Sequence, residues 1–246
     1  MCFSANMSLT LGVAGVIASS ITFSDKSESH WVRMARTYAI LHFSMMEFIQ
    51  YFAYPVADQC GFGTNLMLSE LSTYHISLQA FAIMPALATY SADPNALKRA
   101  AKLGATLSGL FILCNFLPQQ WQLSAVAPNF IGDMISCLVS GKYHIGYHIG
   151  SAYGLFITWG SFFALGLSGF LWKQNHRIAS YHFVMSIATL FMPQWLFGVT
   201  TGEAAAIYCL FSIPITLSFM PCFKKYFQAR LPEFSDNDDL ETAYQS

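Results

Sequence analysis

Five residues whose side chains bind transition metals lie within or beside long apolar stretches of this sequence. They are Glu47, His75, His144, His148 and Cys2. Two or three histidines with one carboxylate are typical of zinc and non-haem iron sites, and a metal held there could activate water. Removal of Met1 would place a free amine beside the thiol of Cys2, and both groups chelate metals. A divalent transition metal site, of zinc or iron, is therefore one interpretation.

The same residues support further interpretations. Ionisable groups inside a membrane often carry protons or ions, so Glu47 could serve a small-solute or proton-coupled transporter or channel. Alternatively, the polar groups only hold helices together, with Glu47 hydrogen-bonded to His75 or Gln79. Haem would need facing histidines, and only His42 and His182 suit an inner site. The residue types leave these alternatives open, including whether the chain is an enzyme.

Further polar residues fall at the same level of the apolar stretches. They are Gln50, Gln79, Gln194, Glu203, Ser4 and Ser8. Polar side chains within a bilayer usually face the protein interior. Because all of them lie in the outer half of their stretches, or at the outer end, the sequence predicts a polar site open to the outside. They would line a pathway there or take part in helix packing.

The elements that must position these residues are membrane helices, as the composition indicates. The chain has 246 residues, of which 54% are hydrophobic and 10% are charged. Soluble domains average about 25% charged residues, and the mean hydropathy here is +0.44. A net charge of −1 gives no basic footprint for nucleic acid, and six cysteines do not make a disulfide scaffold. We therefore expect the surface of the folded chain to contact the lipid bilayer.

Seven stretches are long and apolar enough to cross a bilayer, which takes about 20 residues each. They are 5–23, 37–57, 71–91, 103–117, 145–172, 178–199 and 204–223. The first lacks the preceding Lys or Arg of a signal peptide, so we expect it to be a mature helix. The sequence thus predicts an all-α, seven-helix transmembrane domain over 1–223. The acidic tail, 224–246, is expected to be disordered.

The distribution of Lys and Arg predicts the orientation. Eleven of them fall in the odd-numbered connections and the tail, and one falls in the even-numbered connections. Basic residues stay on the cytoplasmic side, so the N-terminus is expected outside and the tail inside. Cys60 and Cys137 then both lie in outer loops and could form a disulfide in an oxidising compartment. The last stretch has neither the lysine of retinal proteins nor an Asn-Pro-x-x-Tyr motif.

Two local patterns predict packing at the outer side. Glycines recur every four residues at Gly146, Gly150 and Gly154, a spacing that lets another membrane helix approach closely. Apolar residues at helical spacing over 128–140 predict a short amphipathic helix at the outer surface. Neither pattern predicts the oligomeric state or identifies the membrane.

Three short motifs resemble an uncharacterised group of multi-pass membrane proteins. They are Met1-Cys2-Phe3-Ser4, Glu47-x-x-x-Tyr51 and Leu78-Gln79. Members of that group open Met-Cys-Trp/Phe-Ser/Asn and carry Gln-x-x-Glu-x-x-x-Trp, then Leu-Gln-Pro. The resemblance covers mainly residues 1–85. It implies no activity, but it singles out Cys2, Ser4, Glu47 and Gln79.

The sequence departs from that group at three positions. Ser44 stands where the group has glutamine, Tyr51 replaces tryptophan, and Ala80 replaces proline. Seven-span zinc hydrolases of the ceramidase and adiponectin-receptor type are a second comparison, because they carry His-x-x-x-His in the last span. Here that pair is His144 and His148, at the start of the fifth stretch. The sequence therefore does not indicate membership of that family.

Overall fold

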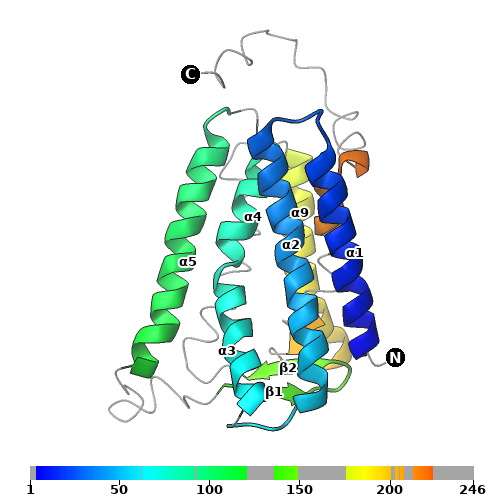
Figure 1. Cartoon of the computed structure of the whole chain (residues 1–246), viewed down its shortest axis with the longest axis vertical. Helices are drawn as coiled ribbons and strands as arrows, with labels where there is room; N and C mark the ends of the chain where they lie inside the picture. Colours follow the sequence, from blue (N-terminus) through cyan, green and yellow to red (C-terminus); the bar gives the residue numbers. More distant parts are fainter. Residues whose placement is uncertain are drawn as a thin grey trace.

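The computed structural model describes residues 4–61, 63–91, 93–120, 136–148, 176–200, 203–204, 206–207 and 213–223. Its helices run side by side along the long axis, and a two-stranded sheet crosses one end (Figure 1). We call this end the hairpin end. The fold is mainly helical, as the sequence predicts, and the small sheet is an addition to the all-α prediction.

The first two predicted spans are one antiparallel pair, α1 (Ala5–Ser24) and α2 (His30–Ala53). Each helix begins after a serine, Ser4 or Ser29, whose hydroxyl accepts a backbone N–H of the first turn at 3.4 Å. α2 therefore starts before the predicted span 37–57. It continues into a 3-10 turn, Tyr54–Val56.

Two glycines bring α1 unusually close to α2. A Cβ atom at Gly15 would lie 1.9 Å from the Ser44 hydroxyl oxygen. A Cβ atom at Gly12 would lie 3.1 Å from the ring of Phe48. Small residues at helix contacts allow such backbone approach and strengthen van der Waals packing. Gly12 and Gly15 therefore determine how closely α1 packs against α2.

The third predicted span, 71–91, is covered by two helices, α3 (Gly63–Ser77) and α4 (Gln79–Ala88). The helical ladder is irregular beside Leu78, where the backbone N–H of Phe81 donates to Ser108 Oγ of the next helix at 3.1 Å. Leu78 keeps helical backbone angles, and the Ala82 N–H still donates to the Leu78 carbonyl at 3.1 Å. The span is thus locally irregular near its middle.

The next helix, α5 (Ala96–Gln120), packs against α4 through small residues. Its buried positions recur every four residues, at Ala96, Ala100, Gly104 and Ser108. A Cβ atom at Gly104 would lie 2.7 Å from the carbonyl oxygen of Ala80. This small-residue contact on α5 is separate from the one that we predicted at Gly146, Gly150 and Gly154, of which Gly146 lies in a β-strand and the other two lie outside the described residues.

A β-hairpin occupies the segment where the sequence predicted two helices. Strands β1 (Cys137–Ser140) and β2 (Ile145–His148) are antiparallel, with Cys137 opposite His148 and Val139 opposite Gly146. The predicted outer helix 128–140 is therefore wrong over 137–140, and the predicted span 145–172 is wrong over 145–148. The apolar runs on both sides of Gly141 are short, and a strand pair buries them with less chain than a helix. Residues 128–135 and 149–172, with Gly150 and Gly154, lie outside the described residues.

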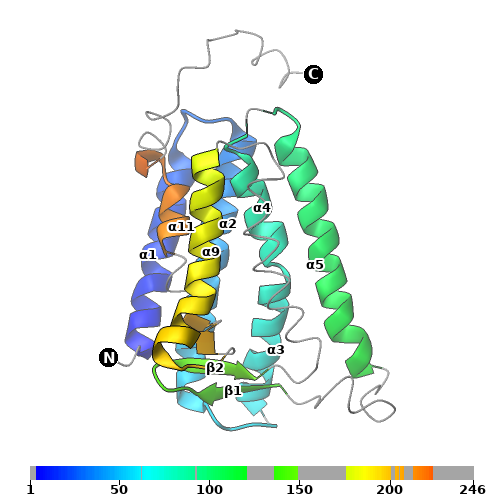
Figure 2. The ribbon, with the colours of Figure 1, turned by 180° about the vertical axis from the view of Figure 1, so that it is seen from behind.

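Two helices complete the described bundle, α9 (His176–Phe197) and α11 (Ile213–Ser218). Figure 2 shows α11 between α1 and α9, at the half of the bundle away from the hairpin end. α9 matches the predicted span 178–199. Within the predicted span 204–223, the described helical residues are 204, 206–207, α11 and 221–223. The predicted tail 224–246 lies outside the described residues.

One helix among the described residues, α1, is long and apolar enough to cross a membrane, with a mean hydropathy of 1.5. A core helix or an N-terminal signal sequence can meet the same criterion. The third predicted span is covered by helices of 15 and 10 residues that meet at Leu78, where the backbone stays helical. The described helices therefore establish a mainly helical fold and do not establish seven spans.

Candidate polar site in the bundle interior

The bundle has a polar interior beneath an apolar surface. The most exposed large apolar residues are Trp195 (84%), Trp31 (68%), Met67 (60%), Phe52 (59%) and Val184 (57%). Apolar side chains also fill the core, but many polar ones are buried beside them. Water-soluble domains seldom bury charged side chains. The combination therefore needs an explanation from the residues inside.

Buried polar side chains line up along three helices, and we call this set the polar column. Its members are Arg36, His42, Ser44, Glu47, Gln50, Asn65, Ser69, Ser72, Thr73, Ser77 and Gln79, each 6% exposed or less. On α2 they extend from Arg36 to Gln50, about 21 Å at 1.5 Å per residue. The four hydroxyl groups of α3 donate to carbonyls four residues earlier at 2.7–2.9 Å. Their oxygen lone pairs remain able to accept hydrogen bonds.

The column contains residues that we did not select from the sequence. Asn65, Ser69, Thr73 and Ser77 recur every four residues, so they share one face of α3. That spacing is visible in the sequence and predicts a polar stripe. Our selection favoured ionisable groups and passed over hydroxyl groups, whose polarity is weaker.

Glu47 lies inside the bundle with its side chain 5% exposed. The hydroxyl of Ser8 on α1 lies beside its carboxyl group. Glu47 also lines a cavity between α1, α2 and α11. The alternative in which Glu47 is hydrogen-bonded to His75 or Gln79 is not seen among the hydrogen bonds of the described residues.

Gln50 joins four segments of the chain. Its Nε2 donates to Tyr147 Oη at 3.1 Å and to the Ala206 carbonyl at 3.3 Å. The Ser8 hydroxyl donates to Gln50 Oε1 at 3.5 Å, and Tyr147 Oη donates to Met46 Sδ at 3.2 Å. This buried amide therefore ties α2 to α1, to β2 and to the segment containing residue 206.

His75 stacks against His42 across the contact between α2 and α3. The ring centroids are 3.8 Å apart and the planes differ by 9°. Parallel stacked rings direct their nitrogen atoms along the ring planes and not toward a point between the rings. The pair therefore packs the interior at the level where α2 faces the end of α3.

The other predicted polar residues lie in different surroundings. Gln79 is buried at the start of α4 with 5% of its surface exposed. Gln194 is half-buried in α9, and its carbonyl accepts the N–H of Gly198 at 3.1 Å. Ser4 caps α1 at the surface of the hairpin end. The structure thus brings Ser8, Glu47 and Gln50 together but leaves Gln194 and Ser4 apart from them.

Glu203 holds the turn of the hairpin. Its carboxylate accepts the consecutive backbone N–H groups of Lys142, Tyr143 and His144 at 3.0, 2.5 and 2.9 Å. Successive N–H groups that point to one place form a concave anion-binding nest. A Cβ atom at Gly141 would lie 2.5 Å from the carboxyl carbon, so glycine is needed for this approach. Glu203 therefore fills an internal anion site at the hairpin end.

His144 lies in that turn, 6% exposed. Its Nδ1 lies 3.1 Å from the carbonyl oxygen of Ile145, and its ring is 5.7 Å from that of Tyr54. Burial lowers the pKa of His144, against the smaller raising effects of the Ile145 carbonyl and the Glu203 carboxylate. A mainly neutral imidazole at neutral pH follows from this balance.

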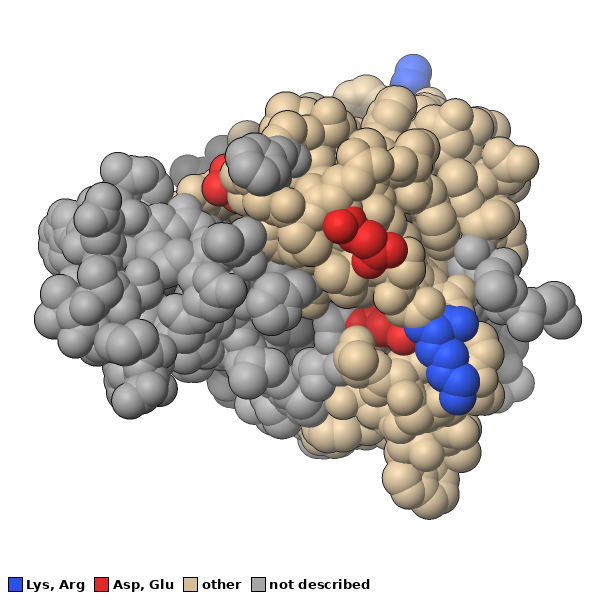
Figure 3. Space-filling view, turned by 90° about the horizontal axis from the view of Figure 1, so that it is seen from below, with Lys and Arg blue, Asp and Glu red and all other residues tan. Residues whose placement is uncertain are grey.

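Two further contacts fasten the hairpin to the end of α2 and the start of α3. The Asn65 amide donates to the carbonyls of Val56 and Leu138 at 2.7 and 2.8 Å, and its oxygen accepts the Leu138 N–H at 3.1 Å. Cys60 and Cys137 form a disulfide, with Cα atoms 5.2 Å apart. The pairing that the sequence left open is thus formed. Figure 3 views this end, whose visible face is mostly uncharged.

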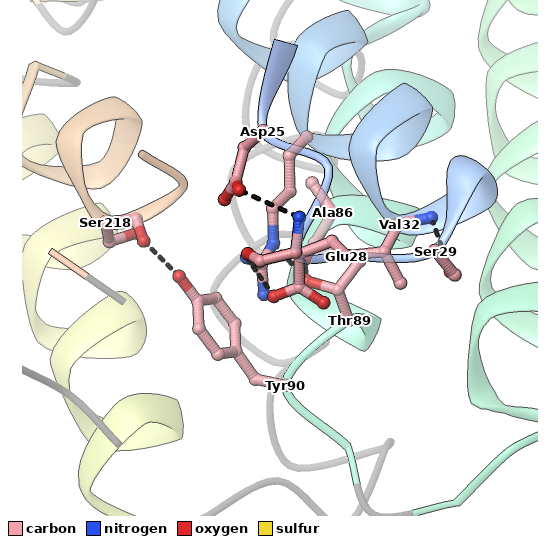
Figure 4. Close-up of polar contacts among 10 residues, drawn as sticks. Asp25, Glu28, Ser29, Val32, Ala86, Thr89, Tyr90 and Ser218 are labelled. Carbon is pink, nitrogen blue, oxygen red and sulfur yellow. Dashed lines mark hydrogen bonds and ion pairs between the residues drawn. The ribbon is translucent and has the colours of Figure 1, made fainter. Parts of the chain in front are cut away.

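A second polar cluster lies at the opposite end of the bundle, around Arg36 (Figure 4). Arg36 Nε donates to Thr89 Oγ1 at 2.9 Å, and Nη1 pairs with Glu28 Oε1 at 3.4 Å. The guanidinium carbon lies 4.7 Å from the ring centre of Tyr90, whose hydroxyl donates to the Ser218 carbonyl. This cluster joins α2, α4 and α11. From the sequence, we counted Arg36 only among the basic residues that precede the second apolar stretch.

The predicted metal ligands do not gather among the described residues. No group of three or more His, Cys, Asp and Glu side chains in the described ranges could hold a metal ion. The helical His144–His148 pair was wrong, because a strand spreads four residues over about 13 Å. Cys2 and the side chain of His148 lie outside what the structure describes. A zinc or iron site that uses them remains a prediction.

Comparison with known proteins gives a family but no activity. The model of a family of unknown function, DUF5765, matches residues 6–228. No curated protein and no solved structure matches the chain. Because the match covers most of its length, the chain belongs to the DUF5765 family.

Proposed function

We propose that this chain is a multi-pass membrane protein whose polar column carries protons across the bilayer, coupled to a small solute, with Glu47 as the proton carrier. The observation that supports the proposal is the polar column itself, buried inside a bundle whose surface is apolar. Ionisable residues buried in membrane bundles commonly mark ion and proton paths. In this proposal the helices span the membrane seven times, as the apolar stretches predict.

Exposed tryptophans support a bilayer around the bundle. Trp31 begins α2 at the end opposite the hairpin, and Trp195 lies in α9 toward the hairpin end. Tryptophan is enriched at the two interfaces of a membrane. The 22 residues of α9 would extend about 33 Å, close to the hydrocarbon thickness of about 30 Å. Each end of the bundle thus carries an aromatic group suited to the headgroup level.

The charged ends support the predicted orientation. Lys26 in the α1–α2 connection and Lys98 and Arg99 in the first turn of α5 lie at the end opposite the hairpin, and Lys142 lies at the hairpin end. The disulfide Cys60–Cys137 is also at the hairpin end. Disulfides persist in oxidising compartments, and basic loops stay in the cytoplasm. Both arguments support an orientation in which the hairpin end faces outside.

The test is proton flux in liposomes. We expect the reconstituted protein to acidify or alkalinise the lumen under an imposed pH gradient, read with an entrapped pH-sensitive dye. Glu47→Gln keeps the shape but cannot ionise, so flux should fall at least tenfold. Glu70→Gln, at a half-buried position on α3, is the matched control and should leave flux unchanged.

Two results would contradict the proposed proton pathway. If Glu47→Gln unfolds at a lower temperature while wild-type protein shows no flux with any gradient, the polar column serves only packing. Flux that is unaffected by Glu47→Gln would remove Glu47 from the pathway.

A further inference from the structure

The cavity beside Glu47 has the features of a site for an organic cation. Its volume is about 120 Å³, and it lies between α1, α2 and α11. Among the described residues of its lining, Glu47 is the one ionisable side chain. The remaining walls are mostly apolar, including Leu11, Ile40, Phe43 and Leu217. A single buried carboxylate therefore faces an otherwise apolar space.

The carboxylate has no cationic partner in the described part of the chain. The ion pairs recorded there are Arg36 with Glu28 and Arg99 with Asp93. The nearby hydroxyls are neutral, and both donate elsewhere: Ser8 to Gln50 Oε1 at 3.5 Å and Ser44 to a backbone carbonyl at 2.8 Å. A buried carboxylate without a counter-charge is costly unless it is protonated or meets a cation. The site therefore favours a positively charged occupant.

The lining selects an organic cation over a metal ion. Calcium takes six to eight oxygen ligands, and magnesium requires an octahedral set. The lining provides one carboxylate and the hydroxyls of Ser44 and Thr216 among apolar groups. An alkyl ammonium needs one counter-charge and an apolar wall for its chain, and the ring of Phe43 adds an aromatic surface near a cation. An apolar cavity of about 150 Å³ holds benzene, so this one suits about five or six heavy atoms.

The cavity reaches the surface at α1. Ala14 lines the cavity and is itself exposed, whereas Glu47 and Ile40 are buried. The opening therefore lies on the side of the bundle, and under the proposed function this side faces lipid. A neutral amine can enter from lipid and take the proton of the Glu47 carboxyl group. The products are an ammonium ion and a carboxylate, with no other reactant needed.

We propose that this cavity binds a small aliphatic amine as its ammonium ion, paired with Glu47. The inference rests on the proposed function, in which Glu47 is the proton carrier, and it names the solute class that would exchange with the proton. Binding itself does not require transport. The two proposals can therefore fail separately.

The experiment uses the full chain in detergent, titrated calorimetrically with n-butylamine and with 1-butanol. We expect butylamine to bind at least tenfold more tightly than butanol, because only the ammonium pairs with the carboxylate. Glu47→Gln should abolish this preference. Ala14→Phe, which blocks the opening from an exposed position, should weaken butylamine at least tenfold. Val13→Phe, at the neighbouring exposed position outside the lining, should change nothing.

Two results would overturn the inference even if Glu47→Gln fails to fold. One is equal affinity of the wild-type protein for butylamine and butanol, and the other is an unchanged butylamine affinity in Ala14→Phe. Amine binding in detergent without proton flux in liposomes would overturn the proposed function and leave the binding site. Proton flux in liposomes without amine binding would overturn the amine site and leave the proposed proton pathway.

Discussion

Three fully buried charged residues are held in three different ways. Glu203, 1% exposed, accepts three backbone N–H groups. Arg36, 3% exposed, has a hydroxyl, a carboxylate and an aromatic ring as neighbours. Glu47, 5% exposed, has one hydroxyl and a cavity. Since uncompensated buried charge is costly, we expect Glu203 and Arg36 to anchor the structure, whereas Glu47 is the one of the three that lines a cavity.

Replacing Glu203 with glutamine tests its anchoring role. The amide group has one oxygen where the carboxylate has two, so its NH₂ would face a backbone N–H and leave that donor unsatisfied. We expect a loss of about 1–3 kcal/mol in the free energy of unfolding. Hydrogen exchange at Lys142, Tyr143 and His144 should accelerate, measured by mass spectrometry. Glu70→Gln is the control, and equal exchange in both variants would contradict the anchor.

The pH dependence of the hairpin depends on Asp58. The hydroxyl of Ser140 and then its backbone N–H lower the pKa of Asp58 below its ordinary value of 3.8, against a small effect of burial. A depressed folded-state pKa means that this contact contributes stability above pH 3.8 and loses it as the pH falls through the lower, folded value. Protection of the Ser140 amide from exchange should fall in that acid range. Asp58→Asn should remove the pH dependence, and a dependence that persists would assign it to another group.

The burial of some individual residues could be predicted from the sequence. Glu47 and Gln50 are polar residues within an apolar stretch, and both are buried, because a helix in that setting turns polar groups inward. The partner of Glu47 could not be predicted, since it depends on how α1 rotates against α2. Arg36 was missed because it precedes the apolar stretch, where a loop position is the usual expectation.

At the scale of elements, small residues decide which helices approach closely. Gly15 opens the contact between α1 and α2, and Gly104 opens that between α5 and α4. The close approach at Gly104 lies beside the irregular turn of the third predicted span, where the Phe81 N–H donates to Ser108. One turn of α5 thus contacts the irregular turn through a small residue and a hydrogen bond.

Two glycines on α5 provide a matched comparison. At Gly104 an added Cβ would lie 2.7 Å from a backbone carbonyl, whereas at Gly109 nothing lies within 4 Å. Gly104→Ala should therefore lower the free energy of unfolding by about 1–3 kcal/mol through overpacking. Gly109→Ala should raise it by about 0.5–1 kcal/mol, as expected for alanine in a helix interior. Thermal unfolding in detergent measures both, and equal shifts would show that α5 does not pack as described.

The helices could be predicted from the apolar stretches, but the hairpin could not. Long apolar runs of about 20 residues gave α1, α2, α5 and α9 their approximate positions. The strands are only four residues each and are held by distant groups, Asn65 and Glu203. Apolar spacing over 128–140 fits a helix locally, and these tertiary contacts override it at 137–140. The Ser140-Gly141 turn signal was the available clue.

Across the whole molecule, the two ends are closed by different chemistry. The hairpin end is fastened by a disulfide, an amide and a carboxylate, and the opposite end by the Arg36 cluster. Between them lie the remaining members of the polar column, of which Gln50 makes hydrogen bonds to three other segments. The two ends are thus fastened by separate groups of contacts.

Removing the disulfide tests how much the hairpin end contributes. The bond closes a sequence separation of 77 residues, so the double substitution Cys60→Ser with Cys137→Ser should cost about 2–4 kcal/mol. Reduction of wild-type protein should lower the melting temperature equally. Cys222→Ser is the control, since Cys222 is an exposed free thiol. A double variant that melts at the wild-type temperature would show that Asn65 and Glu203 suffice.

The same disulfide imposes an order on synthesis of the chain. Cys60 and Cys137 are 77 residues apart. At a translation rate of about 5–20 residues per second, Cys137 is synthesised roughly 4–15 s after Cys60. Cys2 and Cys114 are also made before Cys137, so they are competing thiols during that interval. α3, α4 and most of α5 are complete before the hairpin exists. The native pairing therefore becomes possible only after these helices have been synthesised, whereas α9 and α11 are made later still.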